Sequence, residues 1–232
     1  MAVENQTIIN YKKNMKKIAL FTLALFFITC SKAQQKHRFA DNVEVIKKYD
    51  KMYEPVKDPI IFVGSSSIRK WNHLQEAFGS YKVINRGIGG AVISDIIYYL
   101  DDLVLAYNPR QIVIYVGEND VPNERNTPEV ILNKTKELYN AIRVKLPDVP
   151  VVYISLKPSP VRDKHMQKSR EVNGLIKDFL ATQKNTTFID VFTPMLKDGK
   201  SRPELFVGDR LHMNEKGYAI WEKKIRSALI KP

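Results

Sequence analysis

Five short strand-like segments alternate along the chain with longer segments whose apolar residues recur at helical spacing. The third, 111–116, is apolar and β-branched almost throughout, which is typical of a central parallel strand. Strands that alternate with helices require right-handed crossovers, and these place helices on both faces of a parallel sheet. The pattern predicts an α/β fold, a three-layer α/β/α sandwich around a flavodoxin-like five-stranded parallel sheet. The expected strands are 60–63, 82–85, 111–116, 151–156 and 187–191.

The expected helices are 38–53, 67–78, 93–107, 127–146, 163–182 and a last one capped by Asn214. Thr127 and Pro128 suit the N-cap and the first turn of the fourth helix. Trp71 fits a core position better than a substrate platform. A chain of 232 residues with no Pro/Gly/Ser-rich linker and no repeat predicts a single domain over 34–232.

The first 33 residues are typical of a signal peptide rather than of the folded domain. Four lysines between positions 12 and 17 precede an apolar run, 18–28, that is too short to span a bilayer, and small residues then lead to Ala33. The alternative is a lipoprotein modified at Cys30, although Thr29 fits a lipobox poorly. Met15 is an alternative start. Both interpretations predict a secreted or periplasmic protein without a stable membrane span.

Cysteine content and charge exclude several kinds of chemistry. Cys30 is the only cysteine, so the domain has no disulfide, thiolate nucleophile or cysteine-based metal site. The net charge is +12, and +8 without the first 33 residues, which carry five lysines and one glutamate. Basic residues are mixed with acidic ones and accompany no nucleic-acid-binding motif, so a solvated basic surface is expected and a nucleic-acid partner is not.

The first strand leads directly into Gly64, Ser65, Ser66 and Ser67. Serines after a strand commonly cap a helix, so this turn alone is weak evidence for catalysis. However, ligands of open α/β sheets bind outside the carboxyl ends of the strands, where these hydroxyls would lie. The working hypothesis is that Ser66 is a nucleophile.

Two further turns and one loop belong at the same edge of the predicted sheet. The second strand leads into the glycine-rich turn 86–90, and the third leads into the polar turn 117–120. Near the C-terminus, Asp209 precedes His212 by three residues, so its carboxylate could orient the imidazole as a general base. An isolated pair of this kind more often only fixes a loop. A serine, a base, an acid and two donor-rich turns together form a complete set for acyl transfer.

These four motifs, in this order, resemble the SGNH hydrolases, also called the GDSL esterase/lipase family. The similarity covers about 60–221 and is closest to the branch of platelet-activating-factor acetylhydrolase and carbohydrate acetylesterases. The matching blocks are Gly64-Ser65-Ser66-Ser67, Asn85-Arg86-Gly87-Ile88-Gly89-Gly90, Gly117-Glu118-Asn119-Asp120 and Asp209-Arg210-Leu211-His212.

The resemblance implies a role for each matching residue. Ser66 would be the nucleophile, His212 the general base and then acid, and Asp209 its orienting partner. The backbone N–H groups of Ser66 and Gly90 and the amide of Asn119 would form the oxyanion hole, without cofactor or metal. Ser65 stands where the family usually has Asp, a change expected to tune rate or substrate choice.

The resemblance predicts a secreted serine esterase that hydrolyses small acyl esters, with acetyl groups on carbohydrate as the expected substrate. The partner would therefore be a small-molecule or glycan ester. A lysophospholipase or thioesterase of the same family and an inactive glycan-binding module are the alternatives. The α/β-hydrolase fold is not expected, because its G-x-S-x-G elbow would need Gly where this chain has Ile68.

Overall fold

The computed structural model describes residues 36–232 and contains a five-stranded parallel sheet. The strand order is β2-β1-β3-β4-β5, so β1 pairs with both β2 and β3. All carboxyl ends of these strands therefore lie at one edge of the sheet. The predicted parallel α/β sandwich is confirmed. Its strands are β1 (Ile60–Gly64), β2 (Val83–Gly87), β3 (Gln111–Tyr115), β4 (Val151–Ile154) and β5 (Thr186–Ile189).

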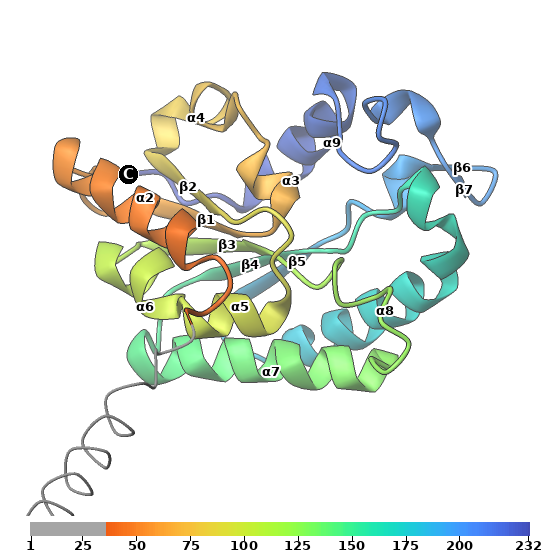
Figure 1. Ribbon diagram of the computed structural model, residues 1–232, viewed down its shortest axis with the longest axis horizontal. Helices are drawn as coiled ribbons and strands as arrows, with labels where there is room; N and C mark the ends of the chain where they lie inside the picture. Colours follow the sequence, from red (N-terminus) through yellow and green to blue (C-terminus); the bar gives the residue numbers. More distant parts are fainter. Residues whose placement is uncertain (1–35) are drawn as a thin grey trace, which may run out of the picture. The chain divides into compact units, whose positions relative to one another are not determined.

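Helices cover both faces of the sheet (Figure 1). One face carries α3 (Ser66–Arg69), α4 (Leu74–Ala77) and α9 (Glu215–Ile225), and the other carries α5 (Ile93–Tyr98), α6 (Leu100–Leu103), α7 (Pro128–Lys145) and α8 (Met166–Ala181). As predicted, Thr127 and Asn214 cap their helices: Thr127 Oγ1 accepts from Val130 N, and Asn214 Oδ1 accepts from Lys216 N. The described residues also form short 3-10 turns: η1 (Gly79–Tyr81), η2 (Leu105–Tyr107), η3 (Pro160–His165), η4 (Thr193–Met195), η5 (Pro203–Leu205) and η6 (Arg226–Ala228).

The core beneath α3, α4 and α9 is rich in aromatic residues. Trp71 and Trp221 are fully buried, and their ring centroids are 5.7 Å apart in an edge-to-face arrangement. Both rings belong to the apolar cluster that includes Phe62 of β1 and Tyr115 of β3. The predicted core position of Trp71 is confirmed. This packing fixes the short helix α3 and the C-terminal helix α9 against the same side of the sheet.

Two predicted helices are divided in the structure, and a third begins with a 3-10 turn. The expected helix over 93–107 is divided into α5, α6 and η2. Its first part is crowded with β-branched and aromatic residues, which lose side-chain freedom in a helix, and its end is set by Asn108 in the left-handed region (φ 43°). The expected helix over 67–78 is likewise divided into α3 and α4, and η3 replaces the first turn of the one expected from 163.

The first described helix, α2 (Ala40–Met52), begins two residues later than expected and buries less of its apolar face. Val43 is buried, but Tyr49 and Tyr53 are more than half exposed. Between β5 and α9 the chain forms the small hairpin β6 (Leu196–Lys197) and β7 (Lys200–Ser201), which the sequence pattern did not predict.

Residues 41–232 form one compact unit, which contains every strand of the sheet. The predicted signal peptide, the alternative start Met15 and the lipidation site Cys30 all lie outside the described residues. Across 36–232, no helix combines the length and apolar character needed to cross a bilayer.

Candidate active site

The end of β1 is built so that the chain can turn sharply beside β3. Gly64 has φ +148°, and a Cβ atom there would lie 1.8 Å from the carbonyl oxygen of Tyr115. Ser65 N donates to that same carbonyl at 2.9 Å, which fixes the turn. Only glycine fits this position, because any side chain would collide with the backbone of the neighbouring strand.

Of the three serines that follow, Ser66 is the one that reaches the surface. Ser65 and Ser67 are each 1% exposed, whereas Ser66 is half-buried at the first position of α3. The helix therefore starts at Ser66 with Ser65 as its N-cap, and the expectation that Ser67 starts it is wrong. The Ser65 carbonyl already accepts the first helical bonds, from Ile68 N and Arg69 N.

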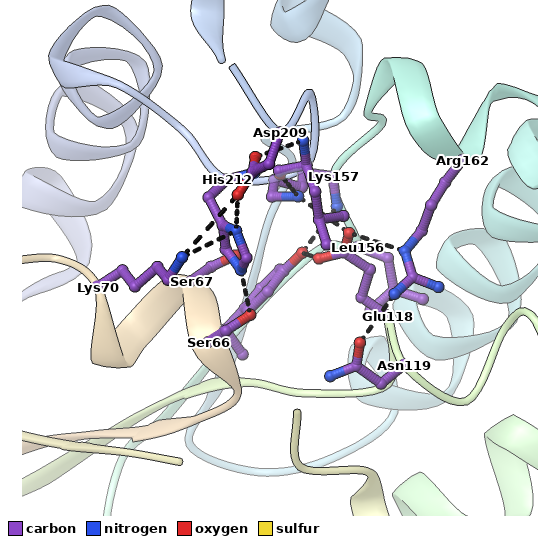
Figure 2. Close-up of polar contacts among 12 residues, drawn as sticks. Ser66, Ser67, Lys70, Glu118, Asn119, Leu156, Lys157, Arg162, Asp209 and His212 are labelled. Atoms are coloured by element: carbon purple, nitrogen blue, oxygen red, sulfur yellow. Dashed lines mark hydrogen bonds and ion pairs between the residues drawn. The ribbon is translucent and has the colours of Figure 1, made fainter. Parts of the chain in front are cut away.

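Ser66, His212 and Asp209 lie in a hydrogen-bonded row (Figure 2). His212 Nε2 is 3.0 Å from Ser66 Oγ, and His212 Nδ1 is 2.5 Å from Asp209 Oδ2. A carboxylate only accepts, so the Nδ1–H donates to Asp209 and the lone pair of Nε2 faces the serine hydroxyl. In this tautomer the imidazole can take the serine proton.

Asp209 is fixed within its own loop as well as by the imidazole. Its Oδ1 accepts from the backbone N–H groups of Leu211 and His212, both at 2.9 Å. Arg210 has φ +57°, which turns the chain back so that the carboxylate and the ring of His212 meet. Desolvation raises the pKa of Asp209, but the hydrogen bonds from His212 and Leu211 outweigh it and hold this pKa below its ordinary value.

Lys70 adds a positive charge beside this pair. Its Nζ lies 3.1 Å from His212 Nδ1 and 3.9 Å from Asp209 Oδ2, and its side chain is half-exposed. Lys70 follows Ser66 by four residues, and this helical spacing places both on the same side of α3. That spacing is the sequence signal that could have indicated Lys70, which the sequence analysis did not single out.

The glycine-rich turn after β2 lies against α3. Asn85 links the two, because its Nδ2 donates to Ile68 O at 2.6 Å and its Oδ1 accepts from Gly87 N at 2.9 Å. A Cβ atom on Gly87 would lie 2.2 Å from Arg69 N, so glycine permits this close approach. Gly90 adopts φ +80° and is followed by Ala91, whose carbonyl contacts the third predicted block.

That third block places Asn119 at the site (Figure 2). Asn119 Nδ2 donates to Ala91 O at 3.0 Å, and Asn119 Oδ1 accepts from Arg162 Nη2 at 2.9 Å. The structure therefore links the Asn119 amide to the residue after Gly90. Its neighbour Asp120 is a structural residue, since its buried carboxylate accepts from Ile93 N and pairs with Lys134.

A buried group of charges lies beside these residues. Lys157 is fully buried, and its Nζ donates to Glu118 Oε1 at 2.9 Å and to Leu211 O at 2.8 Å. Glu118 Oε2 accepts from Tyr115 OH at 2.5 Å. Burial lowers the pKa of Lys157, while Glu118 opposes that shift. Lys157 thus connects the carboxyl ends of β3 and β4 to the loop that carries His212.

The sequence analysis missed Lys157 and Arg162 as parts of this site. Neither residue belongs to one of the four motif blocks. Both residues form ion pairs with Glu118, which lies about 40 positions earlier in the sequence. No local sequence pattern predicts ion pairs over such a separation. Within residues 36–232, no group of three or more His, Cys, Asp or Glu side chains is arranged to hold a metal ion.

The arrangement can activate a hydroxyl for attack on a carbonyl carbon. In such an attack Ser66 would supply the hydroxyl, His212 the base, and Asp209 the partner for the imidazolium. Asn119 provides an N–H donor on the same side of the site.

Comparisons with known proteins agree with this chemistry. Residues 61–220 match the model of the GDSL-like lipase/acylhydrolase family. No curated protein sequence matches the chain. Among solved structures, a Streptococcus pneumonia protein described as a platelet activating factor is similar, with TM-score 0.72 and 19% identity over 90% of this chain and 99% of that one.

Two further structures share the fold. A GDSL-like lipase from Bacteroides thetaiotaomicron has TM-score 0.70 and 19% identity, covering 81% of this chain and 97% of that one. An acetylxylan esterase from Geobacillus stearothermophilus, solved as a catalytic variant, has TM-score 0.61 and 15% identity, covering 77% and 97%. The family match extends over most of the chain and includes all four motif blocks. The chain therefore belongs to the GDSL-like lipase/acylhydrolase family and is a carboxylic ester hydrolase.

Proposed function

We propose that this protein is a secreted serine esterase that removes small acyl groups, acetyl above all, from carbohydrate through a Ser66–His212–Asp209 triad. The observation that carries the proposal is the row of hydrogen bonds from Ser66 Oγ to His212 at 3.0 Å and from His212 to Asp209 at 2.5 Å. Such a row is the arrangement that serine acyl transfer requires.

The reaction proceeds in two halves. Ser66 Oγ attacks the ester carbonyl carbon while His212 Nε2 takes its proton, and the carbonyl oxygen becomes an oxyanion. His212 then returns the proton to the departing alcohol oxygen, which leaves an acyl group on Ser66. Water, deprotonated by His212, attacks this acyl-enzyme and releases the carboxylic acid and free Ser66.

The oxyanion is held by neutral donors, the N–H groups of Ser66 and Gly90 and the amide of Asn119. Losing one such donor typically lowers the rate by about 100 to 1,000-fold. Asn119 is already oriented by Ala91 O and Arg162, so it needs little rearrangement as charge develops.

Two observations support an acetylated carbohydrate as the substrate. A hollow of about 560 Å³ lies beside Lys70, outside the row of Ser66 and His212, and its lining is mostly polar, including Asn72, His73, Glu76 and Asn214. Hydroxyl-rich sugars suit such a lining better than an acyl chain does. Among the structural relatives is an acetylxylan esterase whose catalytic variants replace a Ser, a His and an Asp three residues before that His. Asp209 and His212 have the same spacing.

Secretion rests on the signal-like segment 1–33, and mass measurement of the exported protein from a producing cell checks it. An N-terminus at Gln34 supports cleavage after Ala33, and a lipidated Cys30 supports the lipoprotein alternative.

The activity is tested with p-nitrophenyl acetate, butyrate and palmitate, and with acetylated xylan, using the protein without residues 1–33. We expect kcat/KM to fall as the acyl chain lengthens, and Ser66→Ala to abolish turnover. Ser67→Ala is the matched control, because Ser67 is a buried neighbour with no role in the reaction. Activity that survives in Ser66→Ala would refute the nucleophile. A preference for palmitate would favour the lysophospholipase alternative.

A further inference from the structure

The side chain of Asn119 is held in a single orientation by two partners of opposite kind. Its oxygen accepts from Arg162 Nη2 at 2.9 Å, and its nitrogen donates to Ala91 O at 3.0 Å. Turning the amide over would place its N–H group against a guanidinium and its oxygen against a carbonyl. Both contacts would then be repulsive, so Arg162 and Ala91 together determine which way the amide points.

This orientation leaves one N–H of Asn119 for a ligand. The amide nitrogen carries two hydrogens, and Ala91 O uses one of them. Figure 2 shows the nitrogen on the side of the amide that faces Ser66 and the oxygen on the side that faces Arg162. The second N–H is therefore left to donate to the oxyanion that forms when Ser66 attacks.

Arg162 also forms an ion pair with a buried carboxylate, without a hydrogen bond from its Nε. Arg162 Nε lies 3.5 Å from Glu118 Oε1, and the Glu118 side chain is only 7% exposed. The Glu118 carboxylate is held in turn by Tyr115 OH and Lys157 Nζ. A charge this buried is held tightly by its partners, because water is not there to replace them.

The backbone around Arg162 is anchored to the loop of the triad. Arg162 N donates to Ser159 O at 2.8 Å, and Val161 N donates to Arg210 O at 3.3 Å. Arg210 lies between Asp209 and His212. The guanidinium is therefore placed by groups that also place the base, rather than by a free surface loop.

We propose that Arg162, held by Glu118, is a positioning residue for the oxyanion hole: it keeps the Asn119 amide turned so that an N–H points at the oxyanion. This inference rests on the proposed function. In the ground state the carbonyl oxygen gains little from the donor, whereas the oxyanion gains much. Loss of Arg162 should therefore lower kcat and leave KM nearly unchanged.

A double-mutant cycle on p-nitrophenyl acetate tests the proposal. We expect Arg162→Ala to lower kcat by about 10 to 100-fold, a part of what losing the whole donor costs, with KM within about twofold. In an Asn119→Ala background, the same change should cost less than about threefold, because the group that Arg162 positions is gone. Equal fold losses in both backgrounds, or a change in KM in place of kcat, would overturn the proposal.

A second pair of variants covers the case in which Arg162→Ala does not fold. Arg162→Gln keeps an N–H that can donate to Asn119 Oδ1, whereas Arg162→Met keeps similar length without a donor. We expect the Gln variant to retain clearly more kcat than the Met variant, and equal values would refute the positioning role. Arg170→Met is the matched control, since Arg170 stacks over Phe192 away from the triad, and it should leave kcat unchanged.

The cycle also separates this inference from the proposed function. If Ser66→Ala abolishes activity while the Arg162 and Asn119 effects are additive, the serine esterase stands and the positioning role falls. If the wild-type protein hydrolyses none of the esters, or Ser66→Ala retains full activity, the proposed function fails and the inference fails with it.

Discussion

Replacing Lys157 by Met tests how strongly the buried charges hold the site together. The Lys157 side chain is 0% exposed, and its ammonium has two partners, Glu118 at 2.9 Å and Leu211 O at 2.8 Å. At an effective dielectric constant of about 20, the attraction to Glu118 alone is about 6 kcal/mol before desolvation is counted. Met fills a similar volume, so the substitution removes the charge with little change in packing.

The expected cost is set by the carboxylate that stays behind. Removing one partner of a buried ion pair typically lowers the free energy of unfolding by about 3–5 kcal/mol. Glu118 keeps Tyr115 OH and Arg162, so we expect the lower part of that range. The double variant Glu118→Gln with Lys157→Met leaves no unpaired carboxylate and should recover part of the loss.

Urea unfolding measures the effect, with Lys47→Met as the matched control. Lys47 pairs with Asp102 at 3.2 Å, but both side chains are more than a third exposed, so its loss should leave the unfolding midpoint unchanged. The slope of the transition should be the same in all variants. If Lys157→Met unfolds at the same urea concentration as Lys47→Met, the buried pair of Lys157 and Glu118 does not stabilise the fold.

Further predictions concern the turn after β1, the proposed triad and the tyrosines. Gly64→Ala should prevent stable folding, measured as loss of the cooperative thermal transition, because its Cβ would lie 1.8 Å from Tyr115 O; a near-native melting temperature would contradict the turn geometry. Asp209→Asn should lower kcat by about 10⁴-fold through the wrong imidazole tautomer, and a loss below tenfold would exclude Asp209 as the orienting acid. Folding lowers the pKa of Asp209 from its ordinary value of 3.8. The ionised carboxylate therefore stabilises the fold at pH values above 3.8, and this contribution is lost as the pH falls further. The difference in melting temperature between wild type and Asp209→Asn should therefore shrink below about pH 4. Burial raises the pKa of four tyrosines, that of Tyr107 to about 12, so these groups favour the folded state below about pH 10 and oppose it as the pH rises further. The four are Tyr107, Tyr115, Tyr153 and Tyr218. Tyrosinate absorbance should show that they ionise only as the protein unfolds. Ionisation of all tyrosines near pH 10 in the folded protein would contradict the raised pKa values.

The local sequence was enough to predict the sheet and the order of its elements. Apolar β-branched runs such as 111–116 are typical of central parallel strands, and the polar turns that follow parallel strands lie at one edge of the sheet. The candidates for the triad could also be predicted from local sequence. Ser66 stands in a short motif directly after a strand, and Asp209 and His212 stand in one shortly before a helix. Where helices broke unexpectedly, as after Tyr98, local propensity was too weak to decide the boundary.

Tertiary structure alone decided which groups support these residues. Ser66 reaches His212 across 146 positions of sequence, at 3.0 Å, because the parallel sheet and α9 bring both to one edge. The hydrogen bonds from Lys157 to Leu211 O and from Arg162 to Asn119 likewise join distant segments, and the neighbouring residues do not predict them. The reason is physical: a nucleophile or base is set by local chemistry and turn geometry, whereas its orientation depends on buried charges whose partners are chosen only when the strands and loops pack.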